Sequence, residues 1–474
     1  MHRDAKPQVL SLDHNYAMEE FVGNQGLSER DLEELTPRLE IVHQELSAAR
    51  EKGDLAFLDL PYQTEVVGQI KNLARPYLEW CLDFIVLGIG GSALGTRALR
   101  QALCHPRYNH LPLGRRNHRP KLWVADNIDP DYLFGLMDVV ELRRTVFNVI
   151  SKSGSTAETL AQFLIACKLI RMRAGEDNIR ERIIVTTDPE NGPLRRLVEE
   201  EGFPSLSVPP KVGGRFSVLS AVGLLPAAMA GIDVEELLAG ARFMDQKLKD
   251  APLSRNPAYR LAALNYLFAA KKSRPILVIM PYAAALNGLA DWFCQLWAES
   301  LGKKFDLKGQ VVEAGSTPVK AVGVTDQHSQ LQLYMEGPQD KLITFLEVEN
   351  FQHPVEIPTF FSELEQLGYL GGRSLNELFD KELQATRFNL MKAGRPSLSL
   401  RLPEITPFTV GQLIQLFEVA TVAAGHLFGV NPLDQPGVEG GKQTTYGLMG
   451  RAGFEDRRRE FEEAPPRLEK YRIS

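Results

Sequence analysis

A turn rich in hydroxyl groups lies between the β-branched segment 145–150 and the apolar segment 160–166. The first segment is typical of a buried parallel strand, and the second is typical of a helix. Backbone N–H groups and the positive end of a helix dipole converge on an anion at such a turn. The turn contains Ser151, Lys152, Ser153, Gly154, Ser155 and Thr156. Hydroxyl donors beside a glycine suit a phosphate group, so we predict a phosphate-binding turn.

The same turn has a simpler explanation, in which one Ser or Thr side chain caps the following helix. A cap needs a single hydroxyl, whereas Ser151, Ser153, Ser155 and Thr156 all lie here. The order of residues also differs from a nucleotide-binding P-loop, because Lys152 precedes the glycine instead of following it. The sequence therefore favours a small phosphorylated metabolite over a nucleoside triphosphate.

A second small-residue turn, 88–95, follows the apolar segment 84–87 and includes Gly91 and Ser92. It lacks the third glycine of the dinucleotide fingerprint, and no acidic residue follows at the usual distance. Parallel strands end at the same edge of a sheet. We therefore expect the two turns to offer one phosphate two sets of donors.

Two further positions have charged side chains that suit chemistry. Arg215 follows two glycines, in the segment 212–217, at the start of an apolar helix. Glu299 shares a helix face with the apolar stripe Leu289, Trp292, Phe293, Leu296 and Trp297. A carboxylate at that position suits a general base. On spacing alone, Arg215 could also be a surface residue in a tight turn. For Glu299, spacing alone favours a solvated glutamate at the end of a helix, near Lys303 and Lys304.

The remaining candidates lie in polar loops. His328 is in the loop 323–329, which by itself is typical of an ordinary surface loop. Gln435 and Lys442 lie in the glycine-rich segment 431–442 near the end of the chain.

The order of elements predicts an α/β protein with doubly wound parallel sheets. Apolar strand segments at 84–87, 122–125, 145–150 and 183–186 alternate with helical segments, and a similar pattern restarts at 275–280 with a strand near 342–346. We predict a helical N-terminal layer at 1–80, a first α/β domain at 81–255, a second at 256–442 and a charged C-terminal tail at 443–474.

Composition limits the classes of function. A net charge of −6 gives no support to nucleic-acid binding, and the basic cluster 115–119 is typical of a solvated face. Four widely spaced cysteines and the absence of metal-ligand motifs predict free thiols in a reducing compartment, no metal and no cofactor. The first seven residues lack the apolar core of a signal peptide, and the apolar run 219–232 is too short to span a membrane. We therefore predict a cytoplasmic protein that binds neither nucleic acid nor membranes.

Taken together and in this order, these motifs resemble those of the phosphoglucose isomerase family. The most specific matches are the segments 213–217 and 434–442. The segments 88–92, 151–153, 299–303 and 327–329 fit the family's other motifs. The resemblance implies two sugar-isomerase α/β domains with the active site between them, no metal, and interconversion of glucose 6-phosphate and fructose 6-phosphate in glycolysis and gluconeogenesis.

The resemblance also implies a role for each residue. Glu299 corresponds to the base that moves the proton between C2 and C1, and His328 and Lys442 to the acid/base pair that opens the sugar ring. Arg215 corresponds to the group that stabilises the cis-enediolate, with Gln435 as its hydrogen-bond partner. Gly91, Ser92, Ser151, Lys152, Ser153 and Thr156 correspond to the phosphate site. The family is a homodimer in which the histidine reaches the neighbouring subunit's site, so we expect the same of His328.

Two alternatives remain. A non-catalytic sugar-phosphate sensor on the same domains would keep the hydroxyl turn but could dispense with Glu299, His328 and Lys442. An isomerase of amino-sugar or mannose phosphates would share the domains but is disfavoured by the match at 434–442.

Overall fold

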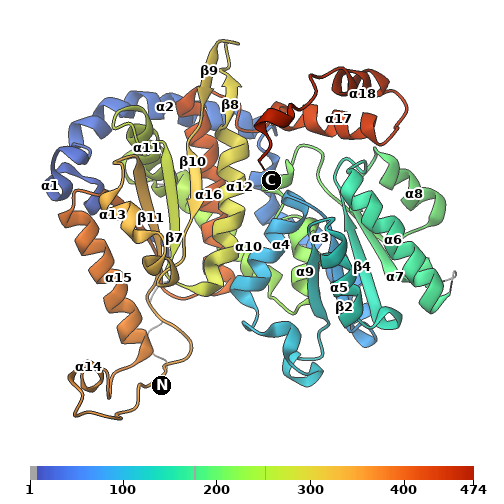
Figure 1. Ribbon diagram of the computed structural model, residues 1–474, viewed down its shortest axis with the longest axis horizontal. Helices are drawn as coiled ribbons and strands as arrows, with labels where there is room; N and C mark the ends of the chain where they lie inside the picture. Colours follow the sequence, from blue (N-terminus) through green and yellow to red (C-terminus); the bar gives the residue numbers. More distant parts are fainter. Residues whose placement is uncertain (1–7, 176–177, 251, 474) are drawn as a thin grey trace.

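The computed structural model describes residues 8–175, 178–250 and 252–473. The first seven residues, whose composition argued against a signal peptide, lie outside the described residues. Two α/β halves lie side by side and meet along a layer of helices (Figure 1).

The first half contains a five-stranded sheet in the order β3-β2-β4-β5-β6, with every neighbouring pair parallel. The strands are β2 (Asp83–Leu87), β3 (Lys121–Ala125), β4 (Thr145–Ile150), β5 (Ile183–Thr187) and β6 (Ser205–Ser207). Phe84 and Val86 pack into one apolar core, whereas Ile85 and Leu87 pack into another on the opposite face. Helices cover both faces, so the predicted doubly wound arrangement is confirmed.

The helices of this half lie between its strands or after the last of them in the sequence. They are α4 (Gly91–Leu103), α5 (Pro130–Val139), α6 (Ala157–Ala174), α7 (Ile179–Arg182), α8 (Pro193–Glu201) and α9 (Ala221–Met229). The chain runs from β2 to β3 on one side and then returns to β4 on the other side of β2. The carboxyl ends of β2 and β4 therefore flank the topological switch point, where ligands bind in open α/β sheets.

The second half repeats this plan. Its sheet has the order β1-β12-β11-β7-β10, in which all pairs are parallel except β1 with β12. The strands are β1 (Ser11–Asp13), β7 (Ile276–Pro281), β10 (Thr317–Lys320), β11 (Lys341–Val348) and β12 (Ser397–Leu402). Strands β7, β10, β11 and β12 thus follow the same order as β2, β3, β4 and β5. The similarity of the two halves, which the sequence suggested only in outline, is a similarity of topology.

A central layer of helices packs between the two sheets. The helices are α10 (Val234–Asp250), α11 (Pro257–Ala270), α12 (Asn287–Leu301) and α16 (Pro407–Phe428), while α13 (Leu331–Glu336) and α15 (Leu375–Lys392) cover the outer face of the second sheet. By length and composition α16 could cross a membrane, but 94% of its most apolar window is buried inside the protein. It is therefore a core helix.

The N-terminal layer consists of α1 (Glu19–Val22), α2 (Glu29–Glu51) and α3 (Thr64–Ala74). Ser28 caps α2 and forms a capping box with Asp31. Leu39, Val42 and Leu46 recur at helical spacing and lie on the buried face of this helix. The layer also contributes β1 to the edge of the second sheet, which the sequence did not predict.

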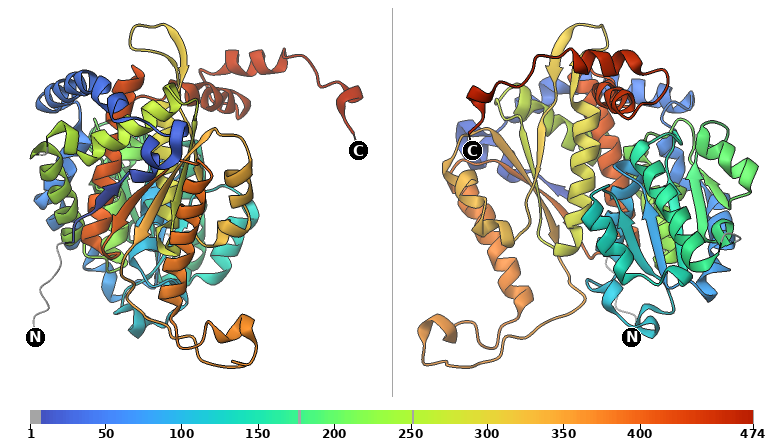
Figure 2. Two further views of the ribbon diagram at one scale, coloured as in Figure 1. Left: turned by 90° about the vertical axis from the view of Figure 1, so that its left-hand side faces the viewer. Right: turned by 45° about the vertical axis from the view of Figure 1, so that its right-hand side comes forward.

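Three extensions project from this body (Figure 2). They are the hairpin of β8 (Lys303–Phe305) and β9 (Val311–Ala314), an arm over residues 349–374 that contains α14 (Glu365–Gly368), and a C-terminal pair of helices, α17 (Glu439–Leu448) and α18 (Glu455–Glu462). The hairpin follows the end of α12, whereas the arm leaves from the carboxyl end of β11.

Candidate active site

Arg215 lies at the junction of the two halves, in a short 3-10 helix (Gly214–Phe216), and is only 1% exposed. It is therefore not a surface residue of a tight turn. Its guanidinium donates to Ser300 Oγ at 2.7 Å, to Glu299 Oε2 at 3.3 Å, to Gln435 Oε1, and to the carbonyls of Pro432 at 2.6 Å and Asp434 at 3.0 Å. Burial lowers the pKa of Arg215, while Glu299 opposes this shift. Arginine stays protonated in proteins, so a fixed positive charge faces Glu299.

Glu299 lies in the last turn of α12, beside the predicted apolar stripe. Trp292 and Trp297 of that stripe are buried, and Trp292 also donates its indole N–H to the carbonyl of Arg215. Gln295, one turn earlier, donates to Glu299 Oε1 at 2.9 Å. The Glu299 side chain keeps 30% of its surface exposed. The carboxylate is therefore held by Gln295 and Arg215 on one side and remains accessible to solvent.

Lys303, near which spacing favoured a solvated Glu299, forms no ion pair with that carboxylate among the described residues. Its ammonium donates to the main-chain carbonyls of Glu299 at 2.6 Å and Ser300 at 2.8 Å, and so satisfies the end of α12. It also approaches Asp434 Oδ1 at 3.7 Å, and burial lowers its pKa. The carboxylate of Glu299 thus pairs with Arg215 instead.

The hydroxyl turn begins where β4 ends. Ser151 is 2% exposed, its hydroxyl shares a 2.9 Å hydrogen bond with Thr156, and its carbonyl accepts from the Thr187 hydroxyl. Thr156 is the N-cap residue of α6 but makes no side-chain cap bond. The hydroxyls therefore bond to each other and do not cap the helix.

The other members of this turn lie nearby. Ser153 Oγ accepts from the backbone and hydroxyl of Ser155, and Gly154 adopts a φ of +65°. Lys152 donates to the carbonyl of Pro210, and burial lowers its pKa.

The turn after β2 lies beside the hydroxyl turn and packs against the main chain next to Arg215. A Cβ on Gly91 would come within 2.2 Å of the carbonyl carbon of Gly214, so only glycine permits this close approach. Ser92 lies next to it in the first turn of α4. Because β2 and β4 are neighbouring strands, both turns share one edge of the sheet, as predicted.

Tyr446 was not singled out by any pattern in the sequence. Its hydroxyl donates to the carbonyl of Ser155 at 3.1 Å, so α17 lies against the hydroxyl turn. Gln295 and Ser300 were also missed. Gln295 could have been found from its spacing, because residues four apart lie on the same face of a helix. The sequence offered no signal for Ser300 except that it lies in the matched segment 299–303.

His328 lies away from this group, at the end of a 3-10 helix (Thr325–His328) that follows β10. The carboxyl end of β10 is fixed near the start of α12, because Lys320 pairs with Asp291 at 2.8 Å. Glu299 lies eight residues further along that helix, about 12 Å away. His328 is exposed, and it follows a strand whose carboxyl end lies near the opposite end of α12 from Glu299.

Lys442 is also outside the Arg215 group. It lies on α17, its side chain is 47% exposed, and its ammonium pairs with Glu439 at 2.7 Å. The structure thus brings together Arg215, Glu299 and Gln435, and it places the hydroxyl turn at the same end of the molecule, but it leaves His328 and Lys442 apart from them.

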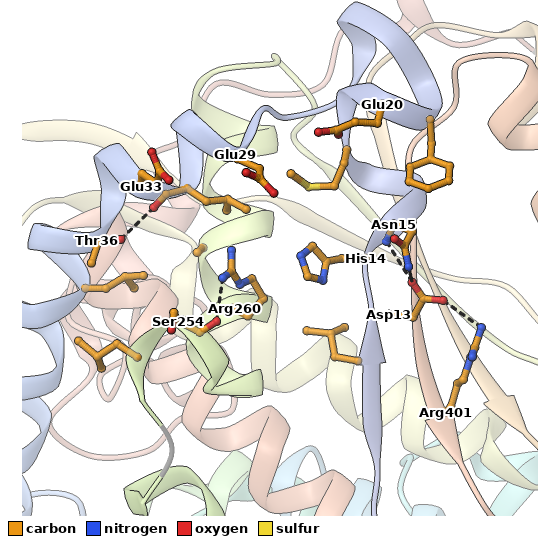
Figure 3. Close-up of a pocket in the computed structure, with 17 residues that line it drawn as sticks. Asp13, His14, Asn15, Glu20, Glu29, Glu33, Thr36, Ser254, Arg260 and Arg401 are labelled. Carbon is orange, nitrogen blue, oxygen red and sulfur yellow. Dashed lines mark hydrogen bonds and ion pairs between the residues drawn. The ribbon is translucent and has the colours of Figure 1, made fainter.

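A large cavity lies away from these residues. It measures about 860 Å³ and lies between the end of β1, the start of α2 and the start of α11 (Figure 3). His14 and Arg260 point into it, but its wall also carries Asp13, Glu20, Glu29 and Glu33. The cavity wall also carries Arg401, which pairs with Asp13, but the four carboxylates outnumber Arg260 and Arg401 and make the cavity unsuitable for a phosphate group. Among the residues that the structure describes, no group of three His, Cys, Asp or Glu side chains could hold a metal ion.

Comparison with known proteins decides the family. The family model described as phosphoglucose isomerase matches residues 78–462. The chain belongs to the phosphoglucose isomerase family. A glucose-6-phosphate isomerase of Carboxydothermus hydrogenoformans is 46% identical over 453 residues, which cover 95% of this chain and 97% of that protein. A glucose-6-phosphate isomerase of Rubrobacter xylanophilus is 48% identical over 430 residues, which cover 90% and 96%.

Solved structures support the fold. A protein of Thermus thermophilus, described only as hypothetical, superposes with a TM-score of 0.83 at 38% identity, covering 93% of this chain and all of that one. A glucose-6-phosphate isomerase of Chlamydia trachomatis superposes with a TM-score of 0.72 at 22% identity, covering 84% and 75%, and supports the fold alone. The phosphoglucose isomerase resemblance is thereby confirmed, while the role of each residue stays a prediction.

Proposed function

We propose that this chain is a glucose-6-phosphate isomerase, an aldose-ketose isomerase that interconverts glucose 6-phosphate and fructose 6-phosphate in glycolysis and gluconeogenesis. The observation that carries the proposal is the buried Arg215 held against Glu299 and Gln435 beside the carboxyl edge of the first sheet. A base and a fixed cation in contact suit a proton transfer that passes through an anion.

In the reaction, Glu299 removes the proton from one carbon and returns it to the other. Its side chain is partly exposed to solvent, while Gln295 and Arg215 fix its orientation. Arg215 stabilises the anionic enediolate through its positive charge and without reorganisation, because Ser300, Gln435 and two main-chain carbonyls already hold the guanidinium in position. Gln435 fixes the position of the guanidinium.

The phosphate group binds at the carboxyl edge of the first sheet. Ser151, Ser153 and Thr156 supply hydroxyls, and α6 supplies N–H groups that no side chain caps. Gly91 and Ser92 contribute from the neighbouring turn, and Lys152 adds a positive charge nearby. Binding energy from the phosphate, which does not react, holds the reacting carbons against Glu299.

Ring opening is assigned to His328 and Lys442, neither of which contacts Glu299 in a single described chain. We infer that a homodimer completes the site, with His328 supplied by the partner subunit. The arm that leaves the same sheet edge as His328 exposes large apolar side chains, namely Val355, Phe360, Phe361, Leu364, Leu367 and Tyr369. Exposed apolar surface of this extent is typical of an interface.

A groove at the base of the arm supports the same assembly. It measures about 370 Å³ and is lined mainly by apolar residues, among them Phe351, Leu375 and Phe379. Val324, which precedes the helix that carries His328, also lines it. A second copy of this chain that covers the groove would bring His328 to the interface. We place this enzyme in the cytoplasm.

A coupled assay tests the activity directly. Fructose 6-phosphate is converted in the presence of a glucose-6-phosphate dehydrogenase, with and without a metal chelator, and mannose 6-phosphate and glucosamine 6-phosphate serve as comparison substrates. We expect turnover of fructose 6-phosphate that the chelator does not change. Absence of turnover would favour a sugar-phosphate sensor, and loss of turnover with chelator would overturn the metal-free mechanism.

A further inference from the structure

Another pocket, lined by basic side chains, lies near the amino end of β3, at the edge of the first sheet opposite to the hydroxyl turn. It is formed by the loop between α4 and β3 and by the turn after α9, and it measures about 300 Å³. Its polar wall consists of His105, Arg115, Arg116, Asn117 and Arg119. We call it the basic pocket.

The basic pocket is separate from the proposed active site. Its loop leads into the amino end of β3, whereas the hydroxyl turn follows the carboxyl end of the parallel strand β4. Helix α4 runs from Gly91, beside Arg215, to Leu103, which lines the basic pocket. Thirteen helical residues span about 20 Å, so the two sites lie at opposite ends of this helix.

Uncompensated positive charge distinguishes the basic pocket. Residues 105–119 include four arginines and three histidines but no aspartate or glutamate. None of the residues that line the pocket is acidic. Within the described part of the chain, no ion pair is formed by Arg115, Arg116 or Arg119. Three guanidinium groups around one cavity repel each other, and this repulsion stands out in a protein whose net charge is −6.

The walls of the basic pocket are fixed by hydrogen bonds. Buried Tyr108 donates its hydroxyl toward the carbonyls of Pro120 at 3.1 Å and Ala230 at 3.0 Å, which ties the loop to the turn after α9. Arg116 is buried and donates to the carbonyls of Leu111 and Arg119. The pocket is therefore held by the fold, and the basic side chains do not merely gather on a mobile surface.

We propose that the basic pocket binds a small anion that carries two phosphate groups. Arginine recognises phosphate oxygens through its paired donors. One phosphate monoester carries about −1.5 to −2 charges at pH 7, so three guanidiniums call for more than one such group. A volume of about 300 Å³ suits a small molecule, and a recessed pocket on an acidic protein is not the extended basic surface that binds nucleic acid.

Isothermal titration calorimetry with inorganic pyrophosphate tests the proposal. All titrations use a parent chain that carries Ser151→Ala and Thr156→Ala, so that the proposed active-site turn contributes little to pyrophosphate binding. The same titrations are repeated with chains in which Ser151 and Thr156 are intact. The test variant adds Arg115→Gln and Arg119→Gln. The matched control adds Arg457→Gln and Arg458→Gln, two arginines of α18 that pair with Glu460 and Glu462.

We expect the test variant to bind pyrophosphate about 100-fold more weakly, because each charged hydrogen bond lost costs roughly tenfold in affinity. The control variant should bind as its parent does, and the added arginine substitutions, made in the chain with an intact hydroxyl turn, should leave isomerase turnover unchanged. Equal losses in the two variants would reduce the effect to net charge and overturn the proposal. Unchanged affinity in the test variant, equally tight binding of orthophosphate, or tighter binding of a single-stranded oligonucleotide would overturn it too.

Discussion

Two parts of the proposed active site differ in how they are built. Arg215, Glu299 and Gln435 lie at the junction of the two halves and contact one another inside one chain. His328 and Lys442 are exposed, and the one ion pair of Lys442 among the described residues is with Glu439 on its own helix. The first part is assembled by the fold of the single chain, and the second part is not.

The difference matches the chemistry assigned to each part. Stabilising an enediolate depends on dipoles and charges that are already in position, and burial makes such interactions stronger. Opening a sugar ring needs proton donors that reach the ring oxygen from outside. A subunit interface or the movement of a helix can deliver such groups after the substrate has bound. The comparison therefore predicts that variants in the two parts fail in different ways.

The largest effect is expected for Glu299→Gln. The amide keeps the shape of the side chain but cannot accept the carbon-bound proton, so turnover should fall by about 10²–10⁴-fold. Binding of sugar phosphates should stay nearly unchanged, since the phosphate turn is untouched. Steady-state kinetics and inhibitor binding measure both quantities. Retention of more than about a tenth of wild-type turnover would rule out Glu299 as the base.

A smaller loss of turnover is expected for Arg215→Lys. A lysine keeps the charge but cannot reach Ser300, Gln435 and the two main-chain carbonyls at once, so kcat should fall by about 10²–10³-fold. The melting temperature should also fall, because buried acceptors lose their donors. Arg457→Lys on exposed α18 is the control and should change neither quantity. Wild-type kcat in Arg215→Lys would show that charge alone is sufficient.

The hydroxyl turn should govern affinity. Ser151→Ala combined with Thr156→Ala should weaken binding of fructose 6-phosphate and 6-phosphogluconate, at about 1.5–3 kcal/mol for each charged hydrogen bond lost. The fold should persist, which circular dichroism can confirm. If both ligands bind the double variant as tightly as wild type, the phosphate lies elsewhere.

Glu418 is buried like Arg215 but, unlike Arg215, has no hydrogen-bond partner among the described residues. Its substitution should change the stability of the fold and not the activity. Glu418 is fully buried in α16, and within the described residues neither carboxyl oxygen has a hydrogen-bond partner, so burial raises its pKa well above the usual value. The folded chain therefore keeps a proton that the unfolded chain releases above about pH 4.3. Stability from this group is complete below that pH and is lost as pH rises toward the folded pKa.

The variant Glu418→Gln has no proton to release. Its melting temperature should therefore exceed that of wild type by more at pH 8 than at pH 5. If the melting temperatures of the variant and of wild type differ by the same amount at both pH values, Glu418 is ionised in the folded chain and the account of its burial is wrong.

The sequence predicted the strands well where both sheet faces are buried. The runs of β-branched and aromatic residues in β2, β4 and β5 are fully buried and were located within one or two residues. The edge strand β1 has only three residues, Ser11–Asp13, and no alternation that could reveal it. The hairpin β8–β9 is largely exposed, and even its apolar residues Phe305 and Val311 face solvent. Pattern alone could not locate these strands, because their pairing depends on tertiary contacts.

The site was predicted unevenly for a similar reason. The composition of the hydroxyl turn and the stripe before Glu299 are local signals. The burial of Arg215 depends on carbonyls of Pro432 and Asp434, more than 200 residues away in the sequence, and no local pattern encodes such a contact. The exposure of Lys442 was equally hidden, because it depends on where α17 lies.

Subunit mixing tests most directly whether the second part of the site comes from a partner. An inactive His328→Ala chain is mixed with an inactive Glu299→Gln chain under conditions in which subunits exchange. In a heterodimer, one of the two sites would combine an intact Glu299 with an intact His328 from the other chain. The account predicts recovery of about a quarter of wild-type activity after random exchange, since half of the dimers would each have one intact site. A mixture that stays inactive despite demonstrated exchange would show that His328 acts within its own chain.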